Sequence, residues 1–163
     1  MSPPRQVFIA VVGAGGVGRC FFNQLAALTT RLSQSASSPI YLSLILVARS
    51  SKVLISDGYK PLNLSTWEED LKSSDSPAKS PSEIADYLAK SPEKVVLVDN
   101  TSNQELADAY PDFLKKGINI VTPNKKAFSG SYSLWKDIFA AASNGGGSGG
   151  YVFHESSVGA GLP

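Results

Sequence analysis

Short apolar runs alternate along this chain with longer segments in which apolar residues recur every three or four positions. The apolar runs are rich in β-branched residues and lie at residues 7–12, 41–47, 95–98, 118–121 and 151–154. Continuous runs of this kind are typical of strands that are buried on both faces of a parallel sheet. The intervening segments predict helices over residues 17–32, just after 65–68, and over 80–90, 102–116 and 131–142. Such alternation predicts an α/β domain with a mostly parallel sheet.

Several of the predicted helices carry boundary signals. The residues Ser80-Pro81-Ser82-Glu83 combine an N-cap serine, a proline in the first turn and a glutamate three positions after the cap. The same serine-to-glutamate spacing occurs at 65–68 and at 102–105. Two lysines and a glycine at 115–117 predict a helix end with a left-handed cap. The glycine-rich tract at 144–150 predicts a flexible, poorly ordered turn.

The first strand and the first helix are joined by a glycine loop with the spacing G-x-G-x-x-G. Gly13 permits a tight turn, Gly15 leaves room for a pyrophosphate, and Gly18 allows the helix to pack close to the strand. The helix N-terminus offers free N–H groups to phosphates. A glycine-rich turn without a ligand is the alternative, but the strand–loop–helix context favours a Rossmann-type, doubly wound domain. The residues expected at the cofactor are Gly13, Ala14, Gly15, Gly16, Val17 and Gly18.

The residue that follows the second strand bears on the choice of dinucleotide. Domains that prefer NAD usually carry an acidic residue there, which holds the ribose hydroxyls. This chain has Arg49 at that position, Lys52 shortly after it and no acidic residue before Asp57. A guanidinium binds phosphate and stacks on adenine, so Arg49 predicts that NADP is preferred over NAD. An ordinary solvent-exposed loop cation is the alternative.

Composition limits the possible partners. The 163 residues are 42% hydrophobic and 18% charged, and 15 basic residues against 14 acidic ones leave a net charge of +1. This balance gives no reason to expect nucleic acid or a membrane surface as partner. No apolar run approaches the roughly 20 residues of a membrane span. Cys20, expected to be buried, is the single cysteine and excludes an internal disulfide. A cytoplasmic protein is the expectation.

Three motifs lie at the ends of the later strands. They are Val98-Asp99-Asn100-Thr101-Ser102, the run from Val121 to Phe128 that contains Thr-Pro-Asn-Lys-Lys, and the run from His154 to Pro163. Together they resemble homoserine dehydrogenase, and the resemblance covers the whole chain. The resemblance implies an oxidoreductase of threonine and methionine biosynthesis. This family interconverts aspartate semialdehyde and homoserine by hydride transfer with NAD(P)H.

The resemblance also implies roles for individual residues. It places Asn100, Thr101, Ser102 and Lys125 beside the nicotinamide half of the cofactor. A partly desolvated Lys125 would polarise a carbonyl or steer an anionic substrate. Its neighbour Lys126 is expected to be an ordinary exposed cation.

The final residues resemble the sodium-binding loop of the family. By that resemblance the ligands are the Glu155 side chain and the backbone carbonyls of Val158, Ala160 and Leu162. Oxygen ligands suit a hard cation; a turn capped by Glu155 is the alternative. The expected division is a nucleotide-binding domain at 1–154, followed at 155–163 by the start of the cation loop and a link to a further domain.

The resemblance implies that the substrate and dimerisation domain, and the main catalytic residues, lie outside this sequence. We therefore expect a chain that binds cofactor without turning over substrate, an exposed apolar patch that promotes self-association, and a homodimer for the full-length enzyme. No residue of the chain is assigned as catalytic. Two alternatives stay open: another NADP-dependent reductase of a small molecule, and a non-enzymatic nucleotide sensor.

Overall fold

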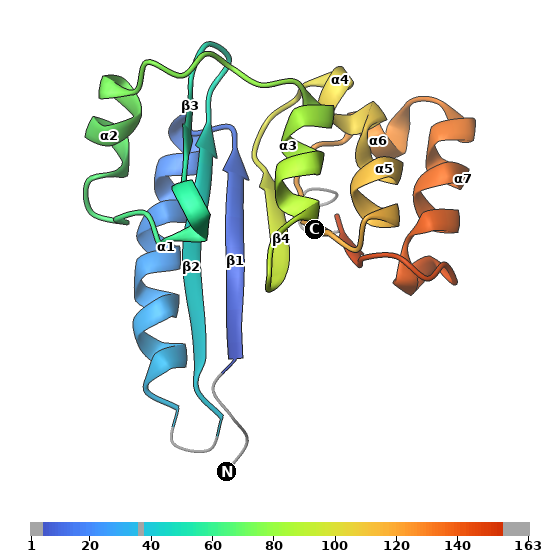
Figure 1. Ribbon diagram of the computed structural model, residues 1–163. Coiled ribbons are helices and arrows are strands. Elements are labelled where there is room, and N and C mark those ends of the chain that lie inside the picture. Colours follow the sequence, from blue (N-terminus) through green and yellow to red (C-terminus); the bar gives the residue numbers. More distant parts are fainter. Residues whose placement is uncertain (1–4, 36–37, 155–163) are drawn as a thin grey trace, which may run out of the picture.

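The computed structural model describes residues 5–35 and 38–154 and contains one six-stranded sheet (Figure 1). The strand order is β3-β2-β1-β4-β5-β6, and every neighbouring pair is parallel except β2 and β3. This order, with the crossover between β1 and β4, confirms the Rossmann-type α/β prediction. The strands are β1 Arg5–Val12, β2 Ile40–Ala48, β3 Val53–Ile55, β4 Lys94–Asp99, β5 Asn119–Val121 and β6 Val152–Phe153.

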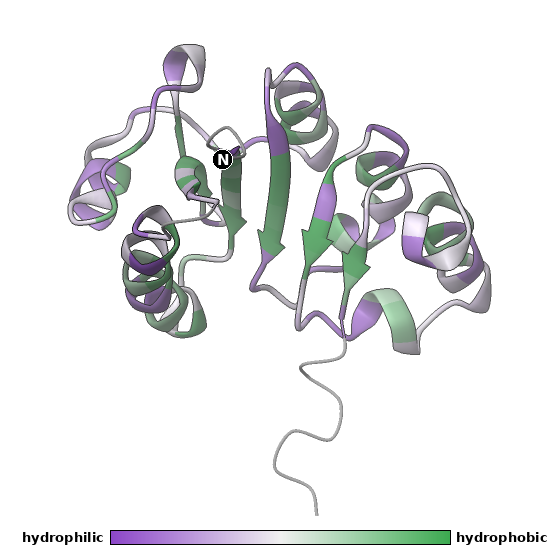
Figure 2. Cartoon of the chain, turned by 90° about the horizontal axis from the view of Figure 1, so that it is seen from below, coloured by the Kyte–Doolittle hydropathy of each residue, from purple (hydrophilic) through white to green (hydrophobic). Residues whose placement is uncertain are grey.

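Helices cover the two faces of the sheet unequally. In Figure 1 the helices α1 and α2 lie to the left of the strands, and α3, α5 and α7 lie to the right. Figure 2 shows the hydrophobic strands with helices on opposite sides of the sheet. The helices are α1 Gly16–Ser33, α2 Trp67–Ser73, α3 Pro81–Ala89, α4 Gln104–Asp108, α5 Tyr110–Lys115, α6 Lys126–Ser129 and α7 Tyr132–Ala141, with short 3₁₀ turns η1 Asp57–Tyr59 and η2 Ser143–Gly145.

Each face of the sheet has its own hydrophobic core. On the α1 side, Phe22 stacks on Trp67 with ring centroids 4.1 Å apart, which fixes α2 against α1. On the opposite side, α5 buries Tyr110, Phe113 and Leu114 completely. Both cores reach the strands, so the loops at the strand ends are held on a rigid frame.

The helix starts show which boundary signals hold. In α3 the predicted capping box is confirmed: the Ser80 Oγ accepts the Glu83 N–H at 3.2 Å, and the Ser80 N–H donates to the Glu83 carboxylate at 2.9 Å. In α2 the N-cap is Thr66, not a serine in a capping box, and its hydroxyl donates to Asp70. The capping box predicted at 65–68 is therefore wrong.

The helix predicted after β4 is divided in two. Asn103 caps α4 by accepting the Leu106 N–H at 2.8 Å, so the predicted cap at Ser102 is wrong by one residue. Pro111 lies in the first turn of α5 and lacks the N–H that would continue α4. Gly117 ends α5 with a φ of +78°, as predicted. The pattern missed β3, η1 and α6, which have only three or four residues each.

The glycine tract after α7 is a close-packed turn, and the prediction of a poorly ordered one is wrong. The Gly147 N–H donates to the Ala142 carbonyl at 2.8 Å, and the Gly150 N–H donates to the Leu114 carbonyl at 2.8 Å. A Cβ atom at Gly149 would lie 2.2 Å from the Leu114 carbonyl oxygen. The glycines are needed because the turn packs directly on the backbone of α5 and α7.

One part of the sheet carries apolar side chains that no described helix covers. At β5 and β6 these are Val121, Tyr151 and Phe153, here called the open sheet face. Val121 and Phe153 are 37% and 55% exposed. A groove of about 500 Å³ runs from this face beneath α1. The expected apolar patch is therefore present, whereas self-association stays a prediction.

The structure also bears on two expectations drawn from composition. Cys20 is exposed, not buried as expected, because α1 turns Gly18, Phe22 and Leu25 toward the sheet instead. Within residues 5–35 and 38–154, no helix has the length and hydropathy that crossing a membrane would require.

Candidate functional site

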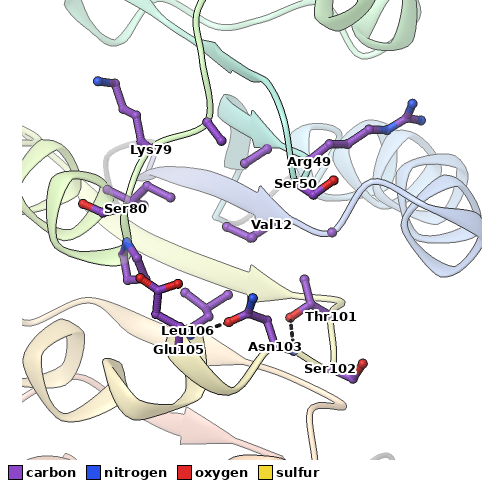
Figure 3. Close-up of a pocket in the computed structure, with 15 residues that line it drawn as sticks. Val12, Arg49, Ser50, Lys79, Ser80, Thr101, Ser102, Asn103, Glu105 and Leu106 are labelled. Carbon is purple, nitrogen blue, oxygen red and sulfur yellow. Dashed lines mark hydrogen bonds between the residues drawn. The ribbon is translucent and has the colours of Figure 1, made fainter.

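The carboxyl ends of β1, β2 and β4 meet at one edge of the sheet and surround a cavity of about 610 Å³ (Figure 3). In sheets of this topology, the crevice at the crossover between neighbouring strands is where ligands bind. Its lining comes from four segments that are far apart in the sequence. They are Val12 and Gly13, residues 48–50, residues 78–81 with Ile84, and residues 101–103 with Glu105 and Leu106.

Gly13 of the glycine loop lines this cavity, and the glycines of the loop differ in the space around them. Gly13 has a φ of +95°, and a Cβ there would lie 2.8 Å from the Asn100 carbonyl carbon. A Cβ at Gly18 would lie 2.4 Å from the Gly13 carbonyl oxygen. By contrast, a Cβ at Gly15 or Gly16 would meet nothing within 4 Å. The loop is thus tight at its two ends and open in the middle.

This open middle fits a pyrophosphate group. It lies at the N-terminus of the 18-residue helix α1, which has no side-chain cap at Gly15 and no acidic residue in its first turn. Free N–H groups and the positive end of the helix dipole favour an anion there. Nearby, the Asn100 side-chain nitrogen is buried and has no hydrogen-bond partner among the described residues. A dinucleotide would supply phosphates to the N-terminus of α1 and acceptor oxygens to the Asn100 side-chain nitrogen.

Arg49 follows β2 in a turn in which its N–H donates to the Lys52 carbonyl at 2.9 Å. Its Nε donates to the carbonyl of Ala14, in the glycine loop, at 3.0 Å. Its guanidinium lies 5.9 Å from the Trp67 ring centre and 3.5 Å from a Glu68 carboxylate oxygen. Arg49, the predicted cofactor contact, therefore lies beside the glycine loop, and its guanidinium group points toward α2.

Glu68 contacts Arg49, and sequence reasoning did not predict this contact. The Glu68 carboxylate forms a close ion pair with Arg19 of α1 and lies 3.5 Å from Arg49 and 3.8 Å from Lys72. Glu68 and these three basic residues are called the Glu68 cluster. The Arg19 hydrogen bond, with further help from Lys72 and Arg49, lowers the pKa of the Glu68 carboxyl. Lys52 lies outside the cluster, since its ammonium donates to the Lys72 carbonyl at 2.8 Å.

A buried polar network lies beneath the ends of β4 and β5. The Tyr110 hydroxyl contacts the Asp99 carboxylate at 2.6 Å and the Thr122 hydroxyl at 2.8 Å. The Asn124 amide donates to the same Asp99 carboxylate at 3.0 Å. Burial, together with the Asp99 charge, raises the pKa of Tyr110 far above its ordinary value. The phenol therefore stays protonated and donates to the carboxylate.

This network ties together the two loops that the resemblance assigns to the nicotinamide half. The Thr101 N–H donates to Asp99 at 2.7 Å, and the Asn124 amide also donates to the Asn103 carbonyl at 3.0 Å. The Asn124 side-chain oxygen accepts the Lys126 N–H at 3.1 Å, which orients the start of α6. Lys125 caps that helix and is exposed, so the expected partial desolvation is wrong in this structure.

The predicted residues fall into three groups. Gly13, Arg49, Thr101 and Ser102 line one cavity, as expected of a shared site. Residues 14–18, Asn100 and Lys125 lie outside the cavity lining, with the Asn100 backbone beside Gly13. The proposed sodium ligands Glu155, Val158, Ala160 and Leu162 lie outside the described residues.

The cavity also has a wall that the sequence did not predict as part of a site. Ala78, Lys79 and Ser80, which precede α3, line the cavity opposite Thr101 (Figure 3). The Ala78 N–H donates to the Ser51 carbonyl at 3.1 Å, which holds this segment beside the turn after β2. No local pattern reveals this long-range pairing.

Comparison with known proteins identifies close relatives. The family model described as homoserine dehydrogenase, NAD binding domain, matches residues 13–150. A homoserine dehydrogenase from Emericella nidulans is 48% identical over all of this chain, which covers 42% of that protein. A crystal structure of a protein of unknown function from Candida auris is 36% identical, with a TM-score of 0.73, and 99% of this chain covers 41% of it.

A hyperthermophilic archaeal homoserine dehydrogenase in complex with NADPH shares the fold. Its TM-score is 0.64 at 24% identity, and 97% of this chain covers 46% of that one. The chain thus spans less than half the length of the proteins it matches.

Proposed function

The chain belongs to the homoserine dehydrogenase family through its NAD-binding domain, and from this premise we propose that it binds NADP(H) for the reduction of aspartate semialdehyde to homoserine. The observation that carries the proposal is the open middle of the glycine loop, which lies at the N-terminus of α1 and follows Gly13 in the cavity lining. When bound, the reduced nicotinamide of NADPH would supply a hydride to the aldehyde carbon and be oxidised to NADP⁺, while the aldehyde oxygen takes up a proton from solvent.

The residues of this chain contribute binding and orientation. The first-turn N–H groups of α1 receive the pyrophosphate, and Gly15 and Gly16 leave the space for it. Arg49, at the end of β2, is the proposed partner of a 2′-phosphate, which makes NADP(H) the preferred form. The Asn100 amide, buried and without a described partner, would donate to the cofactor.

Lys125 is the proposed contact to the nicotinamide half and the substrate. Its side chain is exposed at the start of α6, and the neighbouring Asn124 is fixed by Asp99. An ammonium placed in this way attracts an anionic substrate and stabilises negative charge that develops on a carbonyl oxygen. The roles assigned to the chain are therefore cofactor binding and electrostatic assistance.

A chimera tests the whole reaction. The matching segment of the Emericella nidulans relative is replaced by this chain, and NADP-dependent homoserine oxidation is followed by the absorbance of reduced nicotinamide. We expect activity, and we expect Lys125→Ala to lower kcat/KM by about 100-fold. Lys126→Ala removes an equal charge from the adjacent residue and is the matched control, with little expected change.

Two results would contradict the proposal. A folded chimera that binds NADPH but never oxidises homoserine would favour another NADP-dependent reductase. Equal losses of kcat/KM in Lys125→Ala and Lys126→Ala would contradict a specific role for Lys125.

A further inference from the structure

We propose that Glu68 determines the balance between NADPH and NADH, because its carboxylate competes with the cofactor's 2′-phosphate for the Arg49 guanidinium. This inference rests on the proposed function, since it requires the cavity to bind the dinucleotide. It assigns a specificity role to a residue that lies on α2, away from the strand ends.

The geometry shows that Arg49 is already engaged. One edge of its guanidinium donates to the Ala14 carbonyl, and an Nη atom lies 3.5 Å from the Glu68 carboxylate. Figure 3 shows the Arg49 side chain directed away from Lys79 and Thr101, which line the other walls of the cavity. A 2′-phosphate placed among those walls would therefore have to draw Arg49 from Glu68.

The charges set the sign of the effect. A carboxylate beside the 2′-phosphate repels it and occupies the cation that would bind it. The 2′-hydroxyl of NADH carries no charge, so it is neither repelled by Glu68 nor dependent on an unoccupied Arg49. Glu68 is therefore expected to weaken NADPH binding more than NADH binding. The substitution Glu68→Gln removes the negative charge that holds Arg49 and Arg19, the latter in the first turn of α1.

Glu68 also links α1 to α2, so a structural role must be separated from a specificity role. The link does not depend on this ion pair alone, since Trp67 is buried and stacks on Phe22 at 4.1 Å. Glu68 itself is partly exposed, with 28% of its side chain accessible. Replacing its charge is therefore compatible with a folded α2.

The test is the affinity of the chain for NADPH and for NADH, measured by calorimetric titration of the unaltered protein, Glu68→Gln and Glu69→Gln. Glu69 is the matched control: it is exposed on the same helix and forms no ion pair in the described part of the chain. We expect Glu68→Gln to raise the preference for NADPH over NADH by about threefold to tenfold. Glu69→Gln should leave the preference within about twofold of the unaltered protein.

Two further variants make the result specific. Combining Glu68→Gln with Arg49→Ala should abolish the gain, because the freed guanidinium is its source. Glu68→Asp keeps the negative charge, and we expect its preference for NADPH over NADH to resemble that of the unaltered protein. A melting experiment shows whether Glu68→Gln is folded, and a changed preference in Glu68→Asp would contradict the role of the charge.

The outcomes separate this inference from the proposed function. An unchanged or lower NADPH preference in Glu68→Gln, or an equal rise in Glu69→Gln, would overturn the role of Glu68 while cofactor binding stands. Failure of the unaltered chain to bind either nucleotide would overturn the proposed function itself.

Discussion

Gly15 and Gly18 differ by three positions in the sequence but have opposite surroundings. A methyl group at Gly15 would enter open space, whereas one at Gly18 would lie 2.4 Å from the Gly13 carbonyl oxygen. The first glycine is therefore needed only if a ligand approaches the loop. The second is needed for the fold, because α1 must pass close to the end of β1.

Substitution of these glycines separates binding from stability. Gly18→Ala should lower the free energy of unfolding by about 2 kcal/mol or more, because backbone must move to admit the methyl group. Gly15→Ala should leave the melting temperature unchanged and weaken NADPH binding by about tenfold or more, since the methyl group occupies the pyrophosphate space. Urea unfolding and calorimetric titration measure the two effects. Unaltered NADPH affinity in Gly15→Ala would contradict the placement of the phosphates.

At the scale of elements, the loops after β4 and β5 are connected through Asp99, which is completely buried. Its carboxylate is bonded to the Thr101 N–H, the Tyr110 hydroxyl and the Asn124 amide. These bonds fix the loop that carries Thr101 relative to the loop that carries Lys125. The side of the cavity near Arg49, which is proposed to hold the adenosine half, takes no part in these hydrogen bonds.

Asp99→Asn should therefore affect one half of the cofactor. An amide at this position offers its NH₂ to the Asn124 NH₂, so one contact is lost and stability falls by about 1–3 kcal/mol. We expect NADPH to bind about fivefold more weakly, whereas 2′,5′-ADP, which lacks the nicotinamide half, binds as before. Tyr110→Phe is the milder companion variant. Equal weakening of both ligands would show that Asp99 supports the domain as a whole and not the nicotinamide side.

A second element-scale contact joins η1 to α3. The Tyr87 hydroxyl donates to the Ser56 carbonyl at 2.9 Å, and its ring stacks on Tyr59 with centroids 4.9 Å apart. Burial, and then the neighbouring Tyr59, raises the pKa of Tyr87 to about 12. The folded state thus favours the protonated phenol over the phenolate.

This shift predicts a loss of stability in alkali. The contribution of Tyr87 is fully present below its unfolded pKa near 10, and it is lost as the pH rises from there to about 12. Between about pH 9 and about pH 11 we expect the unaltered chain to lose on the order of 1 kcal/mol more than Tyr87→Phe, which has no hydroxyl to titrate. Urea unfolding at the two pH values measures the difference. Parallel losses in both proteins would contradict the assignment.

At the scale of the molecule, the sequence predicted what local patterns encode. Continuous apolar runs predicted the parallel sheet, the glycine spacing predicted the loop, and Ser80 with Glu83 predicted the start of α3. Contacts between distant segments could not be predicted from local patterns. Arg49 contacts Glu68 only because α2 packs against α1. The tract at 144–150 was misread because glycines that permit close backbone packing have the same composition as a flexible linker.

The open sheet face gives a whole-molecule prediction. Apolar side chains without a described cover favour association in water. We expect the chain to self-associate at high concentration, and we expect Phe153→Ser to reduce this, as measured by light scattering. Tyr132→Ser is the control, because Tyr132 is 73% exposed on α7, away from this face. A monodisperse monomer at high concentration would contradict the prediction.

The central claim is that the cavity at the ends of β1, β2 and β4 is an NADP(H) site. Its most direct test is calorimetric titration of the 163-residue chain with NADPH and with NADH. The account predicts one site per chain with tighter binding of NADPH, because the Arg49 guanidinium can exchange its Glu68 contact for the 2′-phosphate. Absence of binding by both nucleotides would contradict the claim, and tighter binding of NADH would contradict the part assigned to Arg49.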